Sequence, residues 1–529
     1  MNFLQSEKRT FAILFIIYLI SNIFLLLNYN GIYWDDWVLY GNSFSTLNNI
    51  FIQAVGYAGY VSSGLHYFLL NLGNGIFSYR VLTFILLFLN GIFIYKIMEN
   101  LRIIPKIDIF FIVLFILVAP LYSAKIALID FPYTFFTTIF FMAFYLLSKN
   151  IHELNIIKRI LILSLFFFSF WINSILVFYA IVLIYIFYFM YSYEVTFFRN
   201  IYIFVKSKID FILLPVVFFV VKSIYFVPSG IYAGYNSIKL SKFLDLEIFY
   251  KTFELNFIDP IIVSLSSVNL LIVILILSLI LLFLPNLSTR ENNNTQKLDV
   301  YFLLIGFLTF LLGVFAYIAV GKLPSLYNWA SRLQVLLPLG FSIILYYGIQ
   351  ILSNLLNFKE IFKIFIYSVL ILSFVIFNLK EQIRYNIDWM YQQSIMENFR
   401  TSYIIRDNTT FIVTNELGDK LVDGRKLGFY QLNGMAELVL GNDSRFFPAT
   451  EKELDKFGKY KSQKHYNFST WESEIPVNLI LKVNPKSQLN KDFYSSLKYL
   501  LKLKYLEFFN QKTFVSEVKK LVYIEYEEK

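Results

Sequence analysis

Long apolar segments recur between residues 11 and 377 of the chain, separated by shorter stretches that carry charged residues. A transmembrane helix needs about 20 consecutive, mostly apolar residues to cross the hydrocarbon core of a bilayer. The chain is 58% hydrophobic, whereas soluble domains contain about 45–50% apolar residues. The sequence therefore predicts an all-α polytopic membrane protein with about 11 transmembrane helices.

The limits of each span follow from its hydrophobicity and from the charges beside it. The segment from 160 to 193 is too long for one span, so we divide it at Trp171-Ile172-Asn173-Ser174, its clearest polar interruption. The first segment lacks a small-residue cleavage site, so we expect it to remain as an anchor. The predicted spans are 11–27, 80–95, 107–118, 132–147, two between 160 and 193, 211–226, 261–284, 301–320, 333–352 and 364–377.

Lys and Arg residues are concentrated in alternate loops, and this bias predicts the orientation of the chain. Loops rich in Lys and Arg stay in the cytoplasm, so we expect the N-terminus there. An odd number of spans then places the C-terminal tail outside the plasma (inner) membrane. The net charge of +10 reflects this topology, and we expect no nucleic acid as a partner. The loops expected outside are 28–79, 119–131, 227–260 and 321–331.

The distribution of acidic residues divides the chain into two parts. Twenty of the 36 Asp and Glu residues lie in the last 150 positions, although the membrane part is much longer. We therefore predict a transmembrane body over 1–379, with a first outer loop at 28–79, and an extracytoplasmic α+β domain over 380–529. Near-helical spacing of apolar residues extends from 380 to 405, and an amphipathic helix is expected at 491–509. Strands are expected at 411–414, 477–483 and 521–526.

Two adjacent carboxylates, Asp35 and Asp36, lie between Trp34 and Trp37 at the start of the first outer loop. Tryptophan prefers the membrane interface, where a charge is costly, so we favour a functional role for the pair. One carboxylate could act as a general base, with its pKa raised by its neighbour and by burial. The pair could instead bind a divalent cation or simply be solvated.

The anchor, the long first loop opening with an acidic pair, and Tyr79-Arg80 at the start of the second span resemble the GT-C superfamily of membrane glycosyltransferases. The resemblance covers the architecture of residues 1–380. It implies a polyprenyl-phosphate sugar donor, used on the outer face, and a glycan, lipid or protein acceptor at the cell surface. It also implies an acidic catalytic residue in the first loop, which is Asp35 here, with Asp36 as its neighbour. The tail lacks a Trp-Trp-Asp segment, which argues against peptide N-glycosylation.

The leaving group in such a transfer is an anionic phosphate, so a cation is expected on the same face. We favour Arg332, which follows Tyr327-Asn328-Trp329-Ala330-Ser331 at the start of the tenth span. A guanidinium there could bind a phosphate at headgroup depth through parallel N–H bonds, but it would serve equally well as an interfacial anchor. The other cationic candidates for substrate binding are Lys322, Arg80 and Lys125.

Asp130 and His66 complete the candidate site residues. Asp130 lies in the second outer loop, where the resemblance implies a second acidic site, so it could assist catalysis. If a metal ion binds, Asp35, Asp36 and Asp130 are its expected ligands; no other cofactor is expected. His66 in the first outer loop could contact donor or acceptor, although a lone His is more often packed in the fold. Cysteine is absent, which excludes disulfides and thiolate metal sites.

Two other functions compete with the transferase. A transporter or flippase for a lipid-linked saccharide would need polar groups in mid-membrane and broken helices, which are sparse here. A glycan polymerase or ligase would be expected to use large late loops with several Arg and His residues. The 227–260 loop contains Lys but neither Arg nor His.

Overall fold

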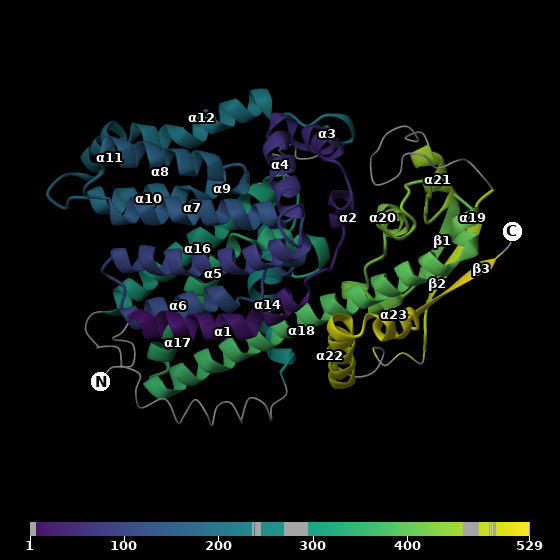
Figure 1. Ribbon diagram of the computed structural model, residues 1–529. Helices are drawn as coiled ribbons and strands as arrows, with labels where there is room; N and C mark the ends of the chain where they lie inside the picture. Colours follow the sequence, from purple (N-terminus) through teal and green to yellow (C-terminus); the bar gives the residue numbers. More distant parts are fainter. Residues whose placement is uncertain are drawn as a thin grey trace.

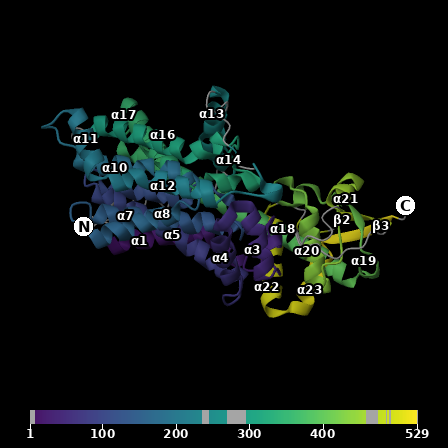
Figure 2. The ribbon, with the colours of Figure 1, turned by 90° about the horizontal axis from the view of Figure 1, so that it is seen from above.

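The computed structural model describes residues 7–234, 237, 245–268, 295–458, 475–485, 487, 489 and 493–527. Figure 1 shows a body of roughly parallel helices with a smaller domain of helices and strands at one end. The first helix starts at the end of the body opposite this domain, and Figure 2 shows the same elongated arrangement from above. The N-terminus and the C-terminal domain therefore lie at opposite ends of the molecule.

Six described helices are long and apolar enough to cross a membrane, which indicates a multi-pass membrane protein. They include the predicted first, second, fourth, ninth, tenth and eleventh spans. These helices are α1 (Glu7–Leu27), α5 (Ile76–Asn100), α7 (Phe131–Lys149), α16 (Thr295–Ala319), α17 (Leu337–Leu355) and α18 (Glu360–Thr401).

The described residues thus show six full-length spans, fewer than the 11 that we predicted. Four other predicted spans form shorter apolar helices, and the eighth, 261–284, lies mostly outside the described residues. The chain does break between 169 and 174, as the polar interruption at Trp171 predicted. The shorter helices are α6 (Lys106–Val118), α8 (Ile156–Ser169), α9 (Ser174–Phe178) with α10 (Ala180–Met190), and α12 (Ile209–Tyr225).

The first predicted outer loop folds into short helices rather than an open loop. They are α2 (Asp36–Leu39), α3 (Phe44–Val55), η1 (Gly56–Ala58) and α4 (Gly59–Leu70), and they lie between the body and the C-terminal domain (Figure 1). Ser43 caps α3, because its hydroxyl oxygen accepts a hydrogen bond from the Thr46 N–H. A Cβ at Gly59 would lie 2.4 Å from the backbone of Phe51, so only glycine permits the close crossing of α3 and α4.

The remaining helices of the body connect the spans. They are η2 (Ser123–Ile126), α11 (Phe197–Ser207), η3 (Gly230–Tyr232), α13 (Leu246–Phe253), η5 (Glu254–Ile258), α14 (Asp259–Ser266) and η7 (Asn328–Gln334). Ser331 in η7 accepts a hydrogen bond from the Ala124 N–H in η2. This bond joins the predicted second outer loop to the segment that carries Arg332.

The C-terminal domain contains a three-stranded sheet, and all three strands lie where the sequence predicted them. The order is β1 (Phe411–Glu416), β2 (Val477–Val483), β3 (Val522–Glu527), with β1 and β2 parallel and β2 and β3 antiparallel. The boundary at 379/380 falls inside α18, which continues without a break from the body into the domain. The other helices are α19 (Tyr403–Asp407), η8 (Gly418–Lys420), η9 (Val422–Gly424), α20 (Phe429–Leu440), α21 (Glu451–Gly458), α22 (Phe493–Phe509) and α23 (Gln511–Lys519).

Helices α16 and α17 pack closely because α17 has a glycine at their crossing. A Cβ at Gly340 would lie 2.4 Å from the backbone nitrogen of Phe310 in α16. In lipid, helix association depends on van der Waals packing, and small residues let two backbones approach. Gly340 therefore sets the distance between these two spans. By contrast, a Cβ at Gly348, on the same helix, would meet no neighbouring atom within 4 Å.

We predict that Gly340→Ala forces α16 and α17 apart and lowers the free energy of unfolding by about 1–3 kcal/mol. Thermal unfolding in detergent, followed by intrinsic tryptophan fluorescence, measures the effect. Gly348→Ala is the matched control and should leave the midpoint unchanged or slightly raised, since Ala favours helix. Equal midpoints for the two variants would contradict this account of the packing.

Candidate functional site

Asp36 joins the first two loops at the end of the body that faces the C-terminal domain. Its side chain is fully buried, and Oδ1 accepts a hydrogen bond of 2.8 Å from the Ile129 N–H of the second loop. Oδ2 accepts a bond of 3.1 Å from the Tyr33 N–H, which closes the turn. Within this turn Trp34 has a φ of +46°, a conformation that L-residues rarely adopt. Asp36 thus holds a strained turn against a second loop.

Arg80, near the start of α5, donates hydrogen bonds to the chain just before the same turn. Its side chain is buried and donates to the carbonyl oxygens of Asn28 (3.1 Å) and Gly31 (2.7 Å). Burial raises the pKa of Asp36 to about 7, while the Arg80 charge and the backbone N–H donors lower it. Arg80 is therefore occupied with the fold of the first loop and is not placed to bind a substrate.

Asp35 points the other way and remains partly exposed. The Tyr430 hydroxyl of α20, in the C-terminal domain, donates a hydrogen bond to its carboxylate. Burial raises the pKa of Asp35, and the hydrogen bond from Tyr430 and the charge of Arg332 lower it in part. Two adjacent residues thus have opposite environments: Asp36 is sequestered, whereas Asp35 is accessible and contacts the domain above it.

Arg332 lies close enough to Asp35 and Asp130 for its charge to act on both carboxyl groups. Its guanidinium carbon is 4.2 Å from the centre of the Trp329 ring, which in turn lies 5.4 Å from the Trp34 ring. Within the described part of the chain, the Arg332 guanidinium makes no hydrogen bond and no ion pair. Its N–H groups are therefore available to an anion beside Asp35.

Asp130 is the third carboxyl of the group. It is buried directly before α7, and its Oδ2 has no hydrogen-bond partner among the described residues. Burial raises the pKa of Asp130 well above its usual range; Arg332 lowers it, whereas Asp36 and Asp35 raise it further. Burial and the two neighbouring carboxylates therefore both favour the neutral form of the Asp130 side chain.

The three aspartates do not form a built metal site. Both Asp36 oxygens already accept backbone hydrogen bonds, and no group of three or more His, Asp or Glu residues in the described ranges could hold a metal ion. Carboxylates that bind Ca²⁺ or Mg²⁺ direct free oxygens toward a common point. The expected metal set of Asp35, Asp36 and Asp130 thus has no support from the geometry.

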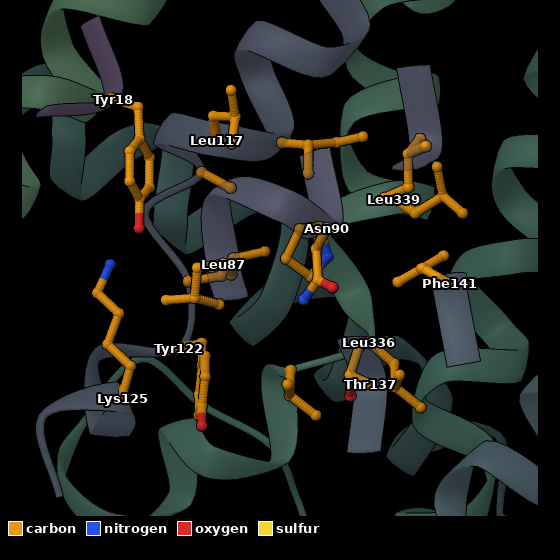
Figure 3. Close-up of a pocket in the computed structure, with 16 residues that line it drawn as sticks. Tyr18, Leu87, Asn90, Leu117, Tyr122, Lys125, Thr137, Phe141, Leu336 and Leu339 are labelled. Atoms are coloured by element: carbon orange, nitrogen blue, oxygen red, sulfur yellow. The ribbon is translucent and has the colours of Figure 1, made fainter. Parts of the chain in front are cut away.

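Lys125 lines a cavity inside the helical body (Figure 3). Its ammonium donates to Asn22 Oδ1 at 2.9 Å, and burial lowers the pKa of Lys125 to about 8. The cavity holds about 70 Å³, and Asn90 and Thr137 in its wall each have an oxygen without a partner among the described residues. This space suits a few water molecules rather than a sugar.

His66 and Lys322 have other surroundings than Asp35. His66 is buried between the rings of Phe51 and Tyr79, with Nδ1 2.9 Å from the Tyr79 hydroxyl. Burial lowers the pKa of His66 to about 3, so the ring is neutral and packs within the loop. Lys322 lines a different pocket of about 250 Å³ beside α13, together with Asp245 and Glu247.

A buried hydrogen-bond network connects the C-terminal domain to Trp37, next to the acidic pair. The sequence alone did not reveal it. Arg425 donates to both oxygens of Asp388 in α18, at 2.9 and 2.7 Å. Gln392 donates to Asp388 Oδ1 and accepts from the Trp37 indole N–H. Arg425 also lies 5.8 Å from the Trp34 ring. The sequence carries no clear signal for this network, because Asp388 is one of many polar residues between 380 and 400.

Tyr430 was missed for a different reason. The chain contains 39 Tyr residues, so a single tyrosine in a loop-rich stretch carries no distinctive signal. Only the packing of α20 against α2 brings its hydroxyl to Asp35. The acidic pair could be found from the sequence, whereas its contact from the C-terminal domain could not.

We predict that Asp36→Ala lowers the free energy of unfolding by about 2–4 kcal/mol, because two buried N–H groups lose their acceptor and Arg80 keeps an unbalanced charge. Asp35→Ala is the matched control at the neighbouring position. It should cost less than about 1 kcal/mol, since Asp35 is partly exposed. Chemical denaturation of the two variants in detergent measures the difference. A larger loss at Asp35 than at Asp36 would reverse the roles given to the two residues.

Comparison with protein-family models gave no match, and comparison with curated proteins gave none either. The resemblance to the GT-C superfamily therefore has no support from sequence similarity. What the chain does must be inferred from the geometry and chemistry of the Asp35 region.

Proposed function

We propose that the protein is a membrane glycosyltransferase that moves a sugar from a polyprenyl-phosphate donor to a glycan, lipid or protein acceptor. One observation carries this proposal: a partly exposed carboxylate, Asp35, lies beside the guanidinium of Arg332, whose N–H groups are unoccupied within the described residues. Transfer from a lipid phosphate needs a base for the acceptor hydroxyl and a cation for the departing phosphate. The two groups supply these requirements side by side.

The reaction would proceed as a displacement at the anomeric carbon of the donor sugar. The acceptor hydroxyl oxygen forms a bond to this carbon while its proton passes to the Asp35 carboxylate. The bond from the carbon to the phosphate oxygen breaks, and its electron pair stays on the phosphate. Arg332 stabilises the resulting charge through its N–H donors, which suit bidentate binding of phosphate.

The environment of Asp35 favours a role as a base. Burial raises the pKa of Asp35, which makes its carboxylate more basic than a solvated one. The hydrogen bond from Tyr430 acts in the opposite direction, because it stabilises the ionised carboxylate. Trp329 holds the Arg332 side chain by stacking at 4.2 Å. Asp130 is buried, and burial raises the pKa of its carboxyl well above the usual range. These features together support a base and an anion site next to each other.

The position of Asp35 and Arg332 agrees with a lipid-linked donor. Asp35 follows α1 by a few residues, and η7 with Arg332 directly precedes α17, so both groups lie where membrane spans end. A phosphate carried on a polyprenyl chain is found at this depth. The alternation of Lys and Arg in the loops supports assignment of this end to the outer face, with the N-terminus in the cytoplasm and the C-terminal domain outside.

A transporter or flippase finds less support. Among the described residues, the cavity lined by Lys125 and Asn90 holds about 70 Å³, which is room for a few water molecules. A glycan polymerase or ligase remains chemically related to the proposal, since it too transfers sugar from a lipid phosphate. The use of Asp35 and Arg332 would be the same in that case.

We predict that Asp35→Asn lowers the turnover number at least about 100-fold, because the amide cannot accept the acceptor's proton. The measurement uses purified protein in nanodiscs, candidate polyprenyl-phosphate sugars, and detection of the released lipid phosphate. Arg332→Gln should also lower turnover, by weakening charge stabilisation on the phosphate. Arg384→Gln is its control, since Arg384 already pairs with Glu381. Unchanged turnover in Asp35→Asn would remove the proposed mechanism.

We predict that Tyr430→Phe moves the acidic limb of the kcat/KM profile to higher pH by about one unit. Asp35 must be ionised to act as a base, and the Tyr430 hydrogen bond stabilises the ionised form. Loss of this bond raises the pKa of Asp35, so activity is lost at a higher pH as the solution is acidified. Tyr403→Phe, at an exposed position in α19, is the control. A profile that shifts equally in both variants would contradict the role of Tyr430.

A further inference from the structure

Helix α22 in the C-terminal domain has apolar side chains on two opposite faces. On one face Tyr499, Leu500 and Leu503 are buried, and the helix packs against α23. The other face is exposed yet mostly aromatic or aliphatic, which is unusual for a helix on the surface of a soluble domain. Its exposed fractions are 46% at Leu501, 62% at Tyr505, 57% at Phe508 and 75% at Phe509.

The C-terminal end of α22 lies at the level where the first membrane span ends. The Phe508 ring is 4.9 Å from the ring of Tyr29, and α1 ends two residues earlier, at Leu27. The Asn30 side-chain amide donates to Glu507 Oε1 at 2.8 Å. Glu507 also pairs with the buried Lys504 at 3.0 Å, which leaves the exposed face free of acidic groups. Phe508 and Phe509 are thus at the boundary of the membrane.

The N-terminal end of α22 lies at a comparable level. The Lys380 ammonium is 5.4 Å from the centre of the Phe493 ring. Lys380 is the first charged residue after the apolar run 364–379 of α18, so it marks the end of that span. Both ends of α22 are therefore next to residues at which a membrane span ends.

The direction of α22 agrees with these two contacts. Figure 1 shows α22 roughly at a right angle to α1, α5 and α7, which cross the body lengthwise. A helix perpendicular to the spans, with both ends at the membrane boundary, lies parallel to the membrane plane. This is the arrangement of an interfacial amphipathic helix.

The charges on the exposed face suit a lipid surface. Lys498 and Lys502 are exposed on the same side as Tyr505. Basic residues near a membrane attract anionic headgroups, and aromatic side chains concentrate at headgroup level.

We propose that α22 is an interfacial helix that docks the C-terminal domain onto the lipid headgroups of the leaflet on its own side. Leu501, Tyr505, Phe508 and Phe509 enter the interface, while Lys498 and Lys502 meet anionic headgroups. The domain is then held at two places, through the continuous helix α18 and through the membrane surface. This docking does not depend on the proposed transferase activity.

Site-directed fluorescence tests the docking, because the chain has no cysteine and a single introduced thiol carries the only label. Tyr505→Cys and Leu501→Cys report on the exposed face of α22. Tyr403→Cys is the matched control, since Tyr403 is 72% exposed but lies in α19, at the far end of the domain in Figure 1. Each variant is labelled with nitrobenzoxadiazole and placed in nanodiscs of phosphatidylcholine and phosphatidylglycerol, with and without a lipid-borne nitroxide.

We expect the nitroxide to quench the labels at 505 and 501 at least threefold more than the label at 403, with emission shifted to the blue. Equal quenching at all three positions would overturn the proposal. A blue shift at 505 without lipid quenching would also overturn it, because a protein contact would then cover the face. Unchanged thermal midpoints of the labelled variants confirm that the fold is intact.

Discussion

The buried carboxylate of Asp36 is the interaction on which the arrangement of the candidate site depends. It accepts hydrogen bonds from the Tyr33 and Ile129 N–H groups and faces the positive charge of Arg80. A buried carboxylate is tolerated only when it is paired and hydrogen-bonded, so this position strongly specifies one conformation. The same bonds fix the turn that presents Asp35 on its other side. Asp35 is therefore positioned by the hydrogen bonds of its buried neighbour Asp36.

The C-terminal domain is part of this arrangement rather than an independent appendage. Helix α18 continues from the membrane body into the domain, and the buried pair of Arg425 and Asp388 fixes the segment before α20 on that helix. One continuous hydrophobic core includes residues of both parts. With α20 fixed in this way, Tyr430 reaches Asp35. A rigid connection through α18 and contact of α22 with the membrane would restrict the domain to small movements beside Asp35 and Arg332.

The sequence predicted those elements of the fold that local periodicity defines. Six full-length spans, the break near Trp171 and the three strands of the domain are local patterns of hydrophobicity and polarity. It also singled out the acidic pair from its flanking tryptophans, Asp130 from the resemblance and Arg332 from its place before the tenth span, and their roles stay predictions. It could not separate Asp35 from Asp36, since adjacent residues in a turn take directions that depend on the backbone. Nor could it show that Arg80 and His66 are packed within the first loop.

The sequence by itself determined that the chain crosses a membrane several times, because the length and hydrophobicity of its segments indicate this. It also determined that an acidic pair follows the first span, because Asp35 and Asp36 are adjacent in the chain. Only the tertiary structure decided which aspartate is accessible, which cation lies beside it, and that Tyr430 contacts it from about 400 residues away in the chain. These relations depend on how α2, η7 and α20 pack together. Such packing sums weak contacts between distant segments, and no local pattern of residues encodes it.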